Sequence, residues 1–185
     1  MKKLASLAVV AGLVAIIVVS NFTVEAAKTN KKTTMTSQKT VSEVNNADGK
    51  VGKDDFAVVV NGVEIKLGED LSTYLKELGK PDELTQARSC NYDGDDKVYT
   101  YGDVILYTYT NGKQDILCSV ELIGETPTLS GIKVGSTKQE VIKAYGNEYT
   151  DDSMYLVYEY TENASIGFQM EKDVVTFIYI DASYE

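Results

Sequence analysis

The sequence predicts an α+β fold of two tandem repeats, each a short helix followed by an antiparallel sheet of three to four strands. First, one shift of the chain aligns Ile65-Lys66-Leu67-Gly68 with Ile132-Lys133-Val134-Gly135 and Gly79 with Gly146 without a gap. Second, an apolar stripe with helical spacing lies between these glycines in both copies. Third, short strands with alternating apolar residues, separated by turn residues, follow each stripe.

Each predicted helix has a start signal and a stop signal. In the second copy, Ser136 and Gln139 have the spacing of a capping box, and Gly146 is expected to end the helix. In the first copy, we expect Asp70 or Glu69 to begin the helix and Gly79 to end it. Helices this short are marginal in isolation, so we expect both to pack on a sheet.

The strands begin with a hairpin at 56–60 and 63–67, because Asn61-Gly62 readily adopts the positive φ angles of a type I′ turn. Later strands are expected at 89–92, 97–101, 104–110 and 115–123 in the first repeat, and at 154–160, 165–170 and 174–181 in the second. Alternation assigns two sets to the core: Ile116, Cys118, Val120 and Leu122, and Val174, Thr176, Ile178 and Ile180. The opposite face of the last strand, with Val175, Phe177 and Tyr179, is also apolar, which predicts either a second cover or an adhesive surface.

The predicted segments are a signal peptide at 1–27, a flexible basic linker at 28–52, the first repeat at 53–125 and the second at 131–185. Two lysines, an apolar run and small residues before a polar stretch are typical of a secretory signal. We therefore expect a secreted or cell-surface protein. The alternative is an uncleaved N-terminal membrane anchor, because the apolar run approaches the ~20 residues of a span.

The predicted linker and the predicted folded part differ in charge. Residues 28–50 contain five lysines and two acidic residues and show no apolar periodicity, which is typical of a solvated tether. Its lysines leave open a weak contact with wall polymer or a membrane surface. Residues 53–185 contain 11 basic and 25 acidic side chains, and this excess of negative charge argues against nucleic-acid binding.

The sequence lacks histidine, which removes the usual general base near neutral pH and a common metal ligand. The acidic turn Asp93-Gly94-Asp95-Asp96 lacks the later glycine and glutamate of a calcium-binding loop, so it is interpreted as a solvated turn. We expect no metal, no cofactor and no catalytic residues. The alternative function is a carboxylate-based hydrolase of an extracellular substrate.

The run from Ile132 to Gly146, opening a helix-then-sheet unit that occurs twice, resembles the tandem fold of the β-lactamase inhibitor protein and related SmpA/OmlA-type envelope modules. It is most similar to secreted repeat proteins of Gram-positive anaerobes. The resemblance covers Phe56 to Glu185. It implies a sheet surface presented to a protein partner. No inhibitory loop is carried over, so β-lactamase inhibition is not implied.

Tyrosines supply the candidate contact residues. Residues two apart on a strand share a face, and rigid amphipathic rings are effective in protein contacts. The candidate binding residues are Tyr99, Tyr101, Tyr107, Tyr109, Tyr158 and Tyr160. The competing interpretation is that tyrosine simply suits half-buried strands.

Cys90 and Cys118 form a possible disulfide, since paired cysteines outside the cell often bond. A simple meander would place them on non-neighbouring strands, too far apart to bond, whereas a different strand order would permit the bond.

Together these observations predict a non-catalytic extracellular or envelope-associated module that binds another protein outside the cell.

Overall fold

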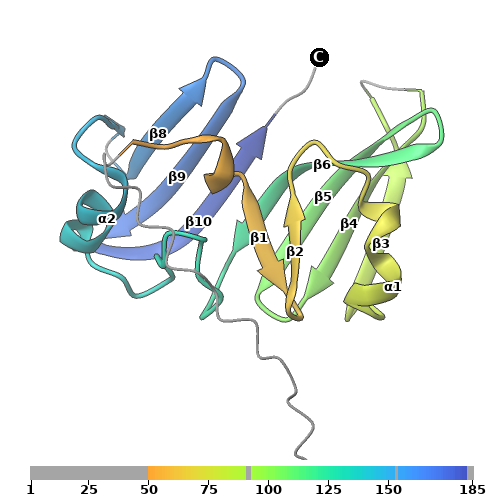
Figure 1. Ribbon diagram of the computed structural model, residues 1–185, viewed down its shortest axis with the longest axis horizontal. Helices are drawn as coiled ribbons and strands as arrows, with labels where there is room; N and C mark the ends of the chain where they lie inside the picture. Colours follow the sequence, from red (N-terminus) through yellow and green to blue (C-terminus); the bar gives the residue numbers. More distant parts are fainter. Residues whose placement is uncertain (1–49, 91–92, 153, 183–185) are drawn as a thin grey trace, which may run out of the picture. The chain divides into compact units, whose positions relative to one another are not determined.

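Most of the regular structure in the computed structural model is β-sheet (Figure 1). The structure describes residues 50–90, 93–152 and 154–182, all of them within the compact unit Val41–Glu185. The predicted signal peptide and residues 28–49 of the predicted linker lie outside the described residues. Among the described residues, no helix has the length and apolar character needed to cross a membrane.

Eight strands form one antiparallel sheet in the order β3-β4-β5-β6-β10-β9-β8-β7. Their bounds are β3 Glu83–Arg88, β4 Asp95–Tyr101, β5 Val104–Asn111, β6 Gln114–Leu122, β7 Thr150–Asp152, β8 Tyr155–Thr161, β9 Ala164–Glu171 and β10 Val174–Ala182. Within each half of the chain, strands that are neighbours in sequence pair with each other, and the turn between β5 and β6 contains Gly112, where φ is 68°. The two halves of the chain join where β6 pairs with β10, with Leu122 opposite Ile178 and Ser119 opposite Asp181.

A two-stranded hairpin, β1 (Ala57–Val60) and β2 (Val63–Lys66), precedes the sheet. Asn61 and Gly62 connect its strands with φ angles of 50° and 82°, which confirms the predicted turn. A 3₁₀ turn, η1 (Lys53–Asp55), leads into the hairpin.

The helical segments are shorter than predicted in the first half of the chain. There a 3₁₀ turn, η2 (Leu71–Thr73), is followed by a single α-helical turn, α1 (Leu75–Leu78). In the second half, α2 (Lys138–Tyr145) runs for two turns. Gly79 and Gly146 end the two helices with φ angles of 79° and 87°, as predicted.

The capping box of α2 lies one residue later than predicted. Thr137, not Ser136, is the N-cap, and its hydroxyl accepts a hydrogen bond from the Glu140 backbone N–H while the Glu140 carboxylate accepts one from the Thr137 N–H. The hydrogen bonds that the Glu140 carboxylate accepts from the Thr137 backbone N–H and from the Thr137 hydroxyl lower the pKa of Glu140. The sequence Ser-Thr-Lys-Gln-Glu offers both registers, so spacing alone does not distinguish them.

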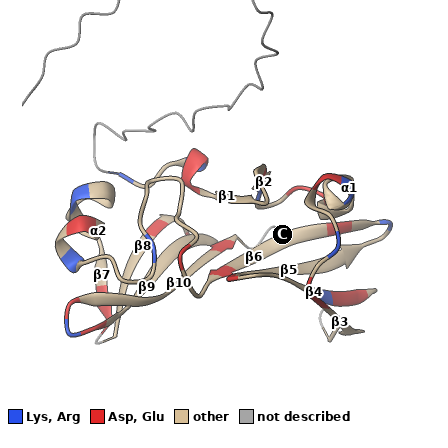
Figure 2. Ribbon diagram, turned by 90° about the horizontal axis from the view of Figure 1, so that it is seen from below, with Lys and Arg blue, Asp and Glu red and all other residues tan. Residues whose placement is uncertain are grey.

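The hairpin and both helices lie on the same side of the sheet (Figure 2). A single apolar core fills the space beneath them and takes side chains from both halves of the chain, including Leu106 and Phe168. The other side of the sheet is covered by no element among the described residues (Figure 2). We call it the outer face. The outward positions of its six central strands alternate with the core residues.

Two β-bulges change which residues face the core. One falls in β6 opposite Tyr107 and Thr108, so that Leu117 is buried although alternation assigned it outward. The other lies between Val175 and Phe177 in β10, where Val175 is buried and Val174 and Thr176 are exposed, opposite to the prediction. Upstream segments bond to the backbone beside each bulge: the Gly68 N–H donates to the carbonyl oxygen of Leu117, and the Gly135 N–H to that of Val175.

The predicted fold class is wrong. The described chain is mostly β, with all strands after the hairpin in one large sheet, and only α2 exceeds a single α-helical turn. It is therefore not a repeat of helix plus sheet. Of the strand predicted at 89–92, Ser89 and Cys90 are described and are not in a strand, while residues 91–92 lie outside the described residues; the edge strand β3 occupies 83–88 instead. β3 is exposed at every position, so it lacks the buried alternation that marks a strand in sequence.

Candidate functional site

The six predicted tyrosines do not gather on one surface. Tyr99, Tyr101 and Tyr158 belong to the buried core on the covered side of the sheet. Alternation along β5 places Tyr109 on the same face as Tyr107, but its side chain is buried beside its strand partner Ile116. Only Tyr107 stands half-buried on the outer face, and Tyr160 is 45% exposed at the end of β8. A single tyrosine contact surface is therefore not formed.

Two of the core tyrosines secure helix ends. The hydroxyl group of Tyr101 donates a hydrogen bond to the carbonyl oxygen of Gly79 (3.2 Å), and that of Tyr158 donates to the carbonyl oxygen of Gly146 (2.9 Å). Both carbonyls lie at helix C-termini, where the backbone lacks intrahelical partners. Desolvation raises the pKa of both phenols. These side chains support the fold and are not positioned to contact a partner.

A shallow groove of about 330 Å³ opens on the outer face, over the junction of β6 and β10. Its lining consists of Tyr107 from β5, Ser119 and Glu121 from β6, and Phe177, Tyr179 and Asp181 from β10. All six side chains are half-buried, because they shield one another on a sheet face with no further cover. Strand pairing places Glu121 opposite Tyr179 and Ser119 opposite Asp181.

Hydrogen bonds orient both carboxylates of the groove. The Tyr107 hydroxyl donates to Glu121 Oε2 (3.0 Å), and the Ser119 hydroxyl donates to Asp181 Oδ1. Desolvation, together with the Glu121 contact, raises the pKa of Tyr107 to about 12. Desolvation raises the pKa of Asp181 above its ordinary value, against the opposing effect of the Ser119 hydrogen bond. The groove therefore holds poorly hydrated acidic oxygens beside aromatic rings.

A neighbouring pair of tyrosines extends the aromatic surface. The Tyr155 and Tyr179 rings lie 6.0 Å apart between centroids, a tilted arrangement favourable for aromatic pairs. Tyr179 is opposite Gly167 in the sheet, and its ring lies where a side chain of residue 167 would stand. The glycine thus lets Tyr179 lie flat across β9.

Sequence reasoning found part of this site. Phe177 and Tyr179 were expected on a face that is either covered or adhesive, and the described residues leave that face open. Tyr107 was among the candidate binding residues, whereas Tyr155, Ser119, Glu121 and Asp181 were not identified as site residues. The alternation of side chains along β6, β8 and β10 places these residues on the outer face. That alternation can be assigned to the two faces only once the bulge in β10 and the pairing of β6 with β10 are known.

Tyr160 lines a larger cavity, of about 700 Å³, between the hairpin and the turn that joins β8 to β9. Its ring lies 5.6 Å from that of Phe56, between centroids. Lys53 and Lys66 stand at the same cavity as Asp54 and Glu69, so the charges of its lining are mixed. This balance of charges does not select one class of ligand.

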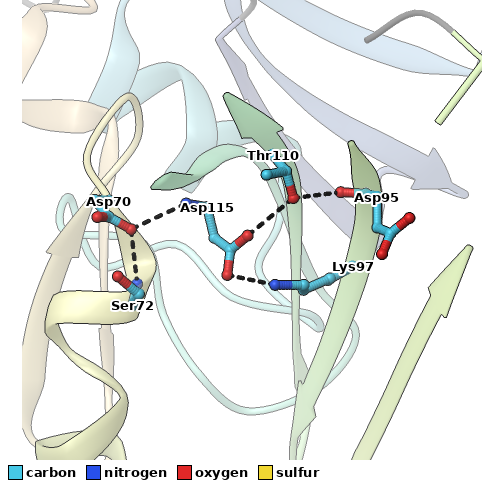
Figure 3. A network of polar contacts seen from close by, with 6 residues as sticks. All are labelled: Asp70, Ser72, Asp95, Lys97, Thr110 and Asp115. Carbon is cyan, nitrogen blue, oxygen red and sulfur yellow. Dashed lines mark hydrogen bonds and ion pairs between the residues drawn. The ribbon is translucent and has the colours of Figure 1, made fainter. Parts of the chain in front are cut away.

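A second group of carboxylates takes part in a network of polar contacts (Figure 3). Asp115 Oδ2 lies 2.6 Å from Lys97 Nζ, and the Thr110 hydroxyl is 3.1 Å from Asp115 Oδ1 and 2.8 Å from the carbonyl oxygen of Asp95. Asp70 accepts hydrogen bonds from the backbone N–H groups of Ser72 and Asp115. The network fastens the turn before α1 to strands β4 to β6.

The network also shifts the acid–base behaviour of its members. The hydrogen bond to Asp115 raises the pKa of Lys97, although partial burial opposes it. Desolvation alone would raise the pKa of Asp70, but the hydrogen bonds it accepts outweigh that effect and lower the pKa. These shifts favour the charged forms, as expected for a supporting ion pair.

Both cysteines are free thiols. Cys90 is exposed in the connection from β3 to β4, and Cys118 is half-buried on β6, two strands from β4. Strands β3 to β6 follow one another as a simple meander, the alternative in which the two cysteines lie on non-neighbouring strands. Among the described residues, no group of three or more His, Cys, Asp or Glu side chains is placed to hold a metal ion.

Comparison with known proteins gives a distant structural neighbour. No protein-family model matches the sequence, and no curated protein matches it. A solved cysteine-rich secretory protein of Staphylococcus aureus subsp. aureus Mu50 is similar over 62% of this chain and 43% of its own, at 14% sequence identity and a TM-score of 0.40. The matched region thus spans less than half of that neighbour's length.

Proposed function

We propose that this chain is a non-catalytic, extracellular or envelope-associated protein-binding module whose contact surface is the outer face of the sheet. One observation carries the proposal: aromatic rings from β5, β8 and β10 stand on a sheet face that no described element covers (Figure 2). An uncovered aromatic surface on a folded domain is typical of an interaction site.

The shape of this surface favours a large partner. Binding sites for small molecules are usually concave and enclose most of the ligand, whereas this groove is shallow. The outer face of six strands measures roughly 25 by 20 Å from standard strand spacing. A face of that size, about 500 Å² in projection, supplies more than half of the ~800 Å² that each partner buries in a specific protein complex.

The chemistry of the face also favours binding over catalysis. Glu121 and Asp181 are held by neighbouring hydroxyl groups on an open surface, and the carboxylates of Figure 3 support the fold. Neither set encloses a substrate. The export signal predicted from residues 1–27 makes a partner outside the cell the natural choice.

Site-specific photo-crosslinking in the source cells tests the proposal. A photoreactive residue replaces Val157, which is half-buried on the outer face, in the full chain, and in a matched chain it replaces Lys76, which is exposed on α1. We expect a discrete protein adduct from position 157 and none from position 76. The proposal fails if position 76 gives the same adduct or position 157 gives none.

A second comparison ties the adduct to the aromatic surface. Phe177→Ala removes a ring from the groove, and Tyr160→Ala removes an exposed ring from the covered side. We expect the first change to reduce the adduct at position 157 about tenfold, as loss of a central contact residue does, and the second to leave it unchanged.

A further inference from the structure

Carboxylates are the only charged side chains at the outward positions of β4, β5, β6, β8, β9 and β10. Alternation and pairing place Asp96, Glu121, Glu159, Glu171 and Asp181 on this face, and no lysine or arginine of these strands joins them. The lysine of β4, Lys97, points instead to Asp115 on the covered side. Apart from Glu171 at the end of β9, which pairs with Lys172 of the following turn, these carboxylates present uncompensated negative charge to a partner that meets this face.

The two carboxylates of the groove are also free of ion pairs. Across the part of the chain that the structure describes, lysine and arginine side chains pair with other acidic residues and not with Glu121 or Asp181. Each carboxylate accepts a hydrogen bond from a hydroxyl group, which orients it without neutralising it. Both retain acceptor capacity for a cationic donor.

Aromatic rings flank these carboxylates on either side. Tyr107 comes from β5 and Phe177 and Tyr179 from β10, so that β6 carries Glu121 between rings from two strands. A cation over an aromatic face is stabilised by the ring quadrupole, and a carboxylate nearby adds a charge-assisted hydrogen bond. Of the cationic side chains, arginine combines both interactions best, because its guanidinium is planar and presents several donors.

We propose that the groove of Tyr107, Ser119, Glu121, Phe177, Tyr179 and Asp181 binds an arginine side chain of the partner protein. The inference rests on the proposed function and adds the chemistry of its central contact. The guanidinium stacks on the aromatic rings and donates hydrogen bonds to Glu121 and Asp181. The surrounding acidic residues of the outer face favour a partner whose contact surface is basic.

The test uses a defined pair of probes: a capped Gly-Arg-Gly peptide and the same peptide with citrulline, the neutral isostere of arginine. Both are titrated into the full chain while the backbone amide signals of β6 and β10 are followed by NMR. We expect the arginine peptide to bind about tenfold more tightly and to shift the signals of residues 119–121 and 177–181. Equal affinity of the two peptides, or no binding of either, overturns the proposal.

Matched variants locate the effect. Glu121→Gln with Asp181→Asn keeps the hydrogen-bond acceptors for Tyr107 and Ser119 but removes both charges, and should reduce arginine binding to the citrulline level. Glu77→Gln with Glu162→Gln removes the same charge from exposed positions elsewhere and should leave binding unchanged. Unfolding temperatures confirm that each protein is folded. Undiminished arginine binding by the first variant overturns the proposal.

The crosslinking experiment distinguishes failure of this inference from failure of the proposed function. If Phe177→Ala removes the adduct at position 157 while the doubly neutralised groove variant keeps it, the outer face binds a partner without an arginine contact, and only the inference fails. If neither variant changes the adduct, both fail.

Discussion

The ring of Tyr179 lies across the backbone of Gly167, so closely that a Cβ added to the glycine would overlap Cε1 of the ring. The two residues are partners in the pairing of β10 with β9. Glycine weakens a strand interior, because it loses more conformational freedom on folding than other residues and offers no side chain to pack. Here the ring of its partner covers the strand instead and holds one wall of the groove in place.

Replacing Gly167 with alanine should therefore destabilise the protein by about 1–3 kcal/mol, the usual cost of overpacking. In the background of Tyr179→Ala, the same change should be neutral or stabilising, because the obstructing ring is gone. Urea unfolding of the two single variants and the double variant measures this coupling. Equal destabilisation in both backgrounds would contradict the contact.

Tyr158→Phe removes the hydrogen bond that the Tyr158 hydroxyl donates to the carbonyl oxygen of Gly146. The C-terminus of α2 thereby loses one hydrogen-bond donor. The expected loss of unfolding free energy is about 1 kcal/mol, typical of a single neutral hydrogen bond. Tyr160→Phe, at an exposed ring, serves as the control and should change stability by less than roughly 0.5 kcal/mol. If the two changes reduce the unfolding free energy equally, the hydrogen bond from Tyr158 to Gly146 does not stabilise the protein as proposed.

Asp70 should make stability depend on pH in the acid range. Its folded pKa lies below the ordinary value of 3.8, so its contribution is fully present above that value and is lost as the pH falls through the folded pKa. Asp70→Asn keeps an oxygen that can cap η2 but does not titrate. Between about pH 6 and pH 2.5, urea unfolding should show a larger loss of stability for the parent chain than for the variant. Equal losses of stability in the parent chain and the variant would contradict the lowered pKa of Asp70.

The cysteines should behave as separate thiols. Without reductant, an alkylating reagent should modify Cys90 first, because it is exposed, and Cys118 slowly, because burial raises the pKa of its thiol and reduces the thiolate fraction. Peptide mass mapping over a time course follows both sites. Alkylation that requires prior reduction would instead indicate a disulfide between them.

Local features of the structure were predictable wherever they depend on a few neighbouring residues. Asn61-Gly62 forms the expected turn, and Gly79 and Gly146 end helices because each adopts a positive φ angle. Most strands lie within a few residues of their expected positions. The backbone preferences of single residues determine these features, so they can be read from the sequence.

Features set by distant contacts were not predictable in this way. The pairing of β6 with β10 merges the strands into one sheet, and no local pattern distinguishes that pairing from two separate sheets. The bulges in β6 and β10 shift the alternation by one residue, which exchanged the expected faces of Leu117 and Val175. The same errors concealed the groove, since its residues come from both sides of the β6–β10 junction.

The position of β10 governs when this sheet can be completed. Every other strand precedes it in the chain, yet it lies between β6 and β9 in the middle of the sheet. Until it arrives, β6 and β9 each expose an unpaired hydrogen-bonding edge, and such edges recruit strands from neighbouring chains. A truncation before residue 174 should therefore yield insoluble material rather than a smaller domain.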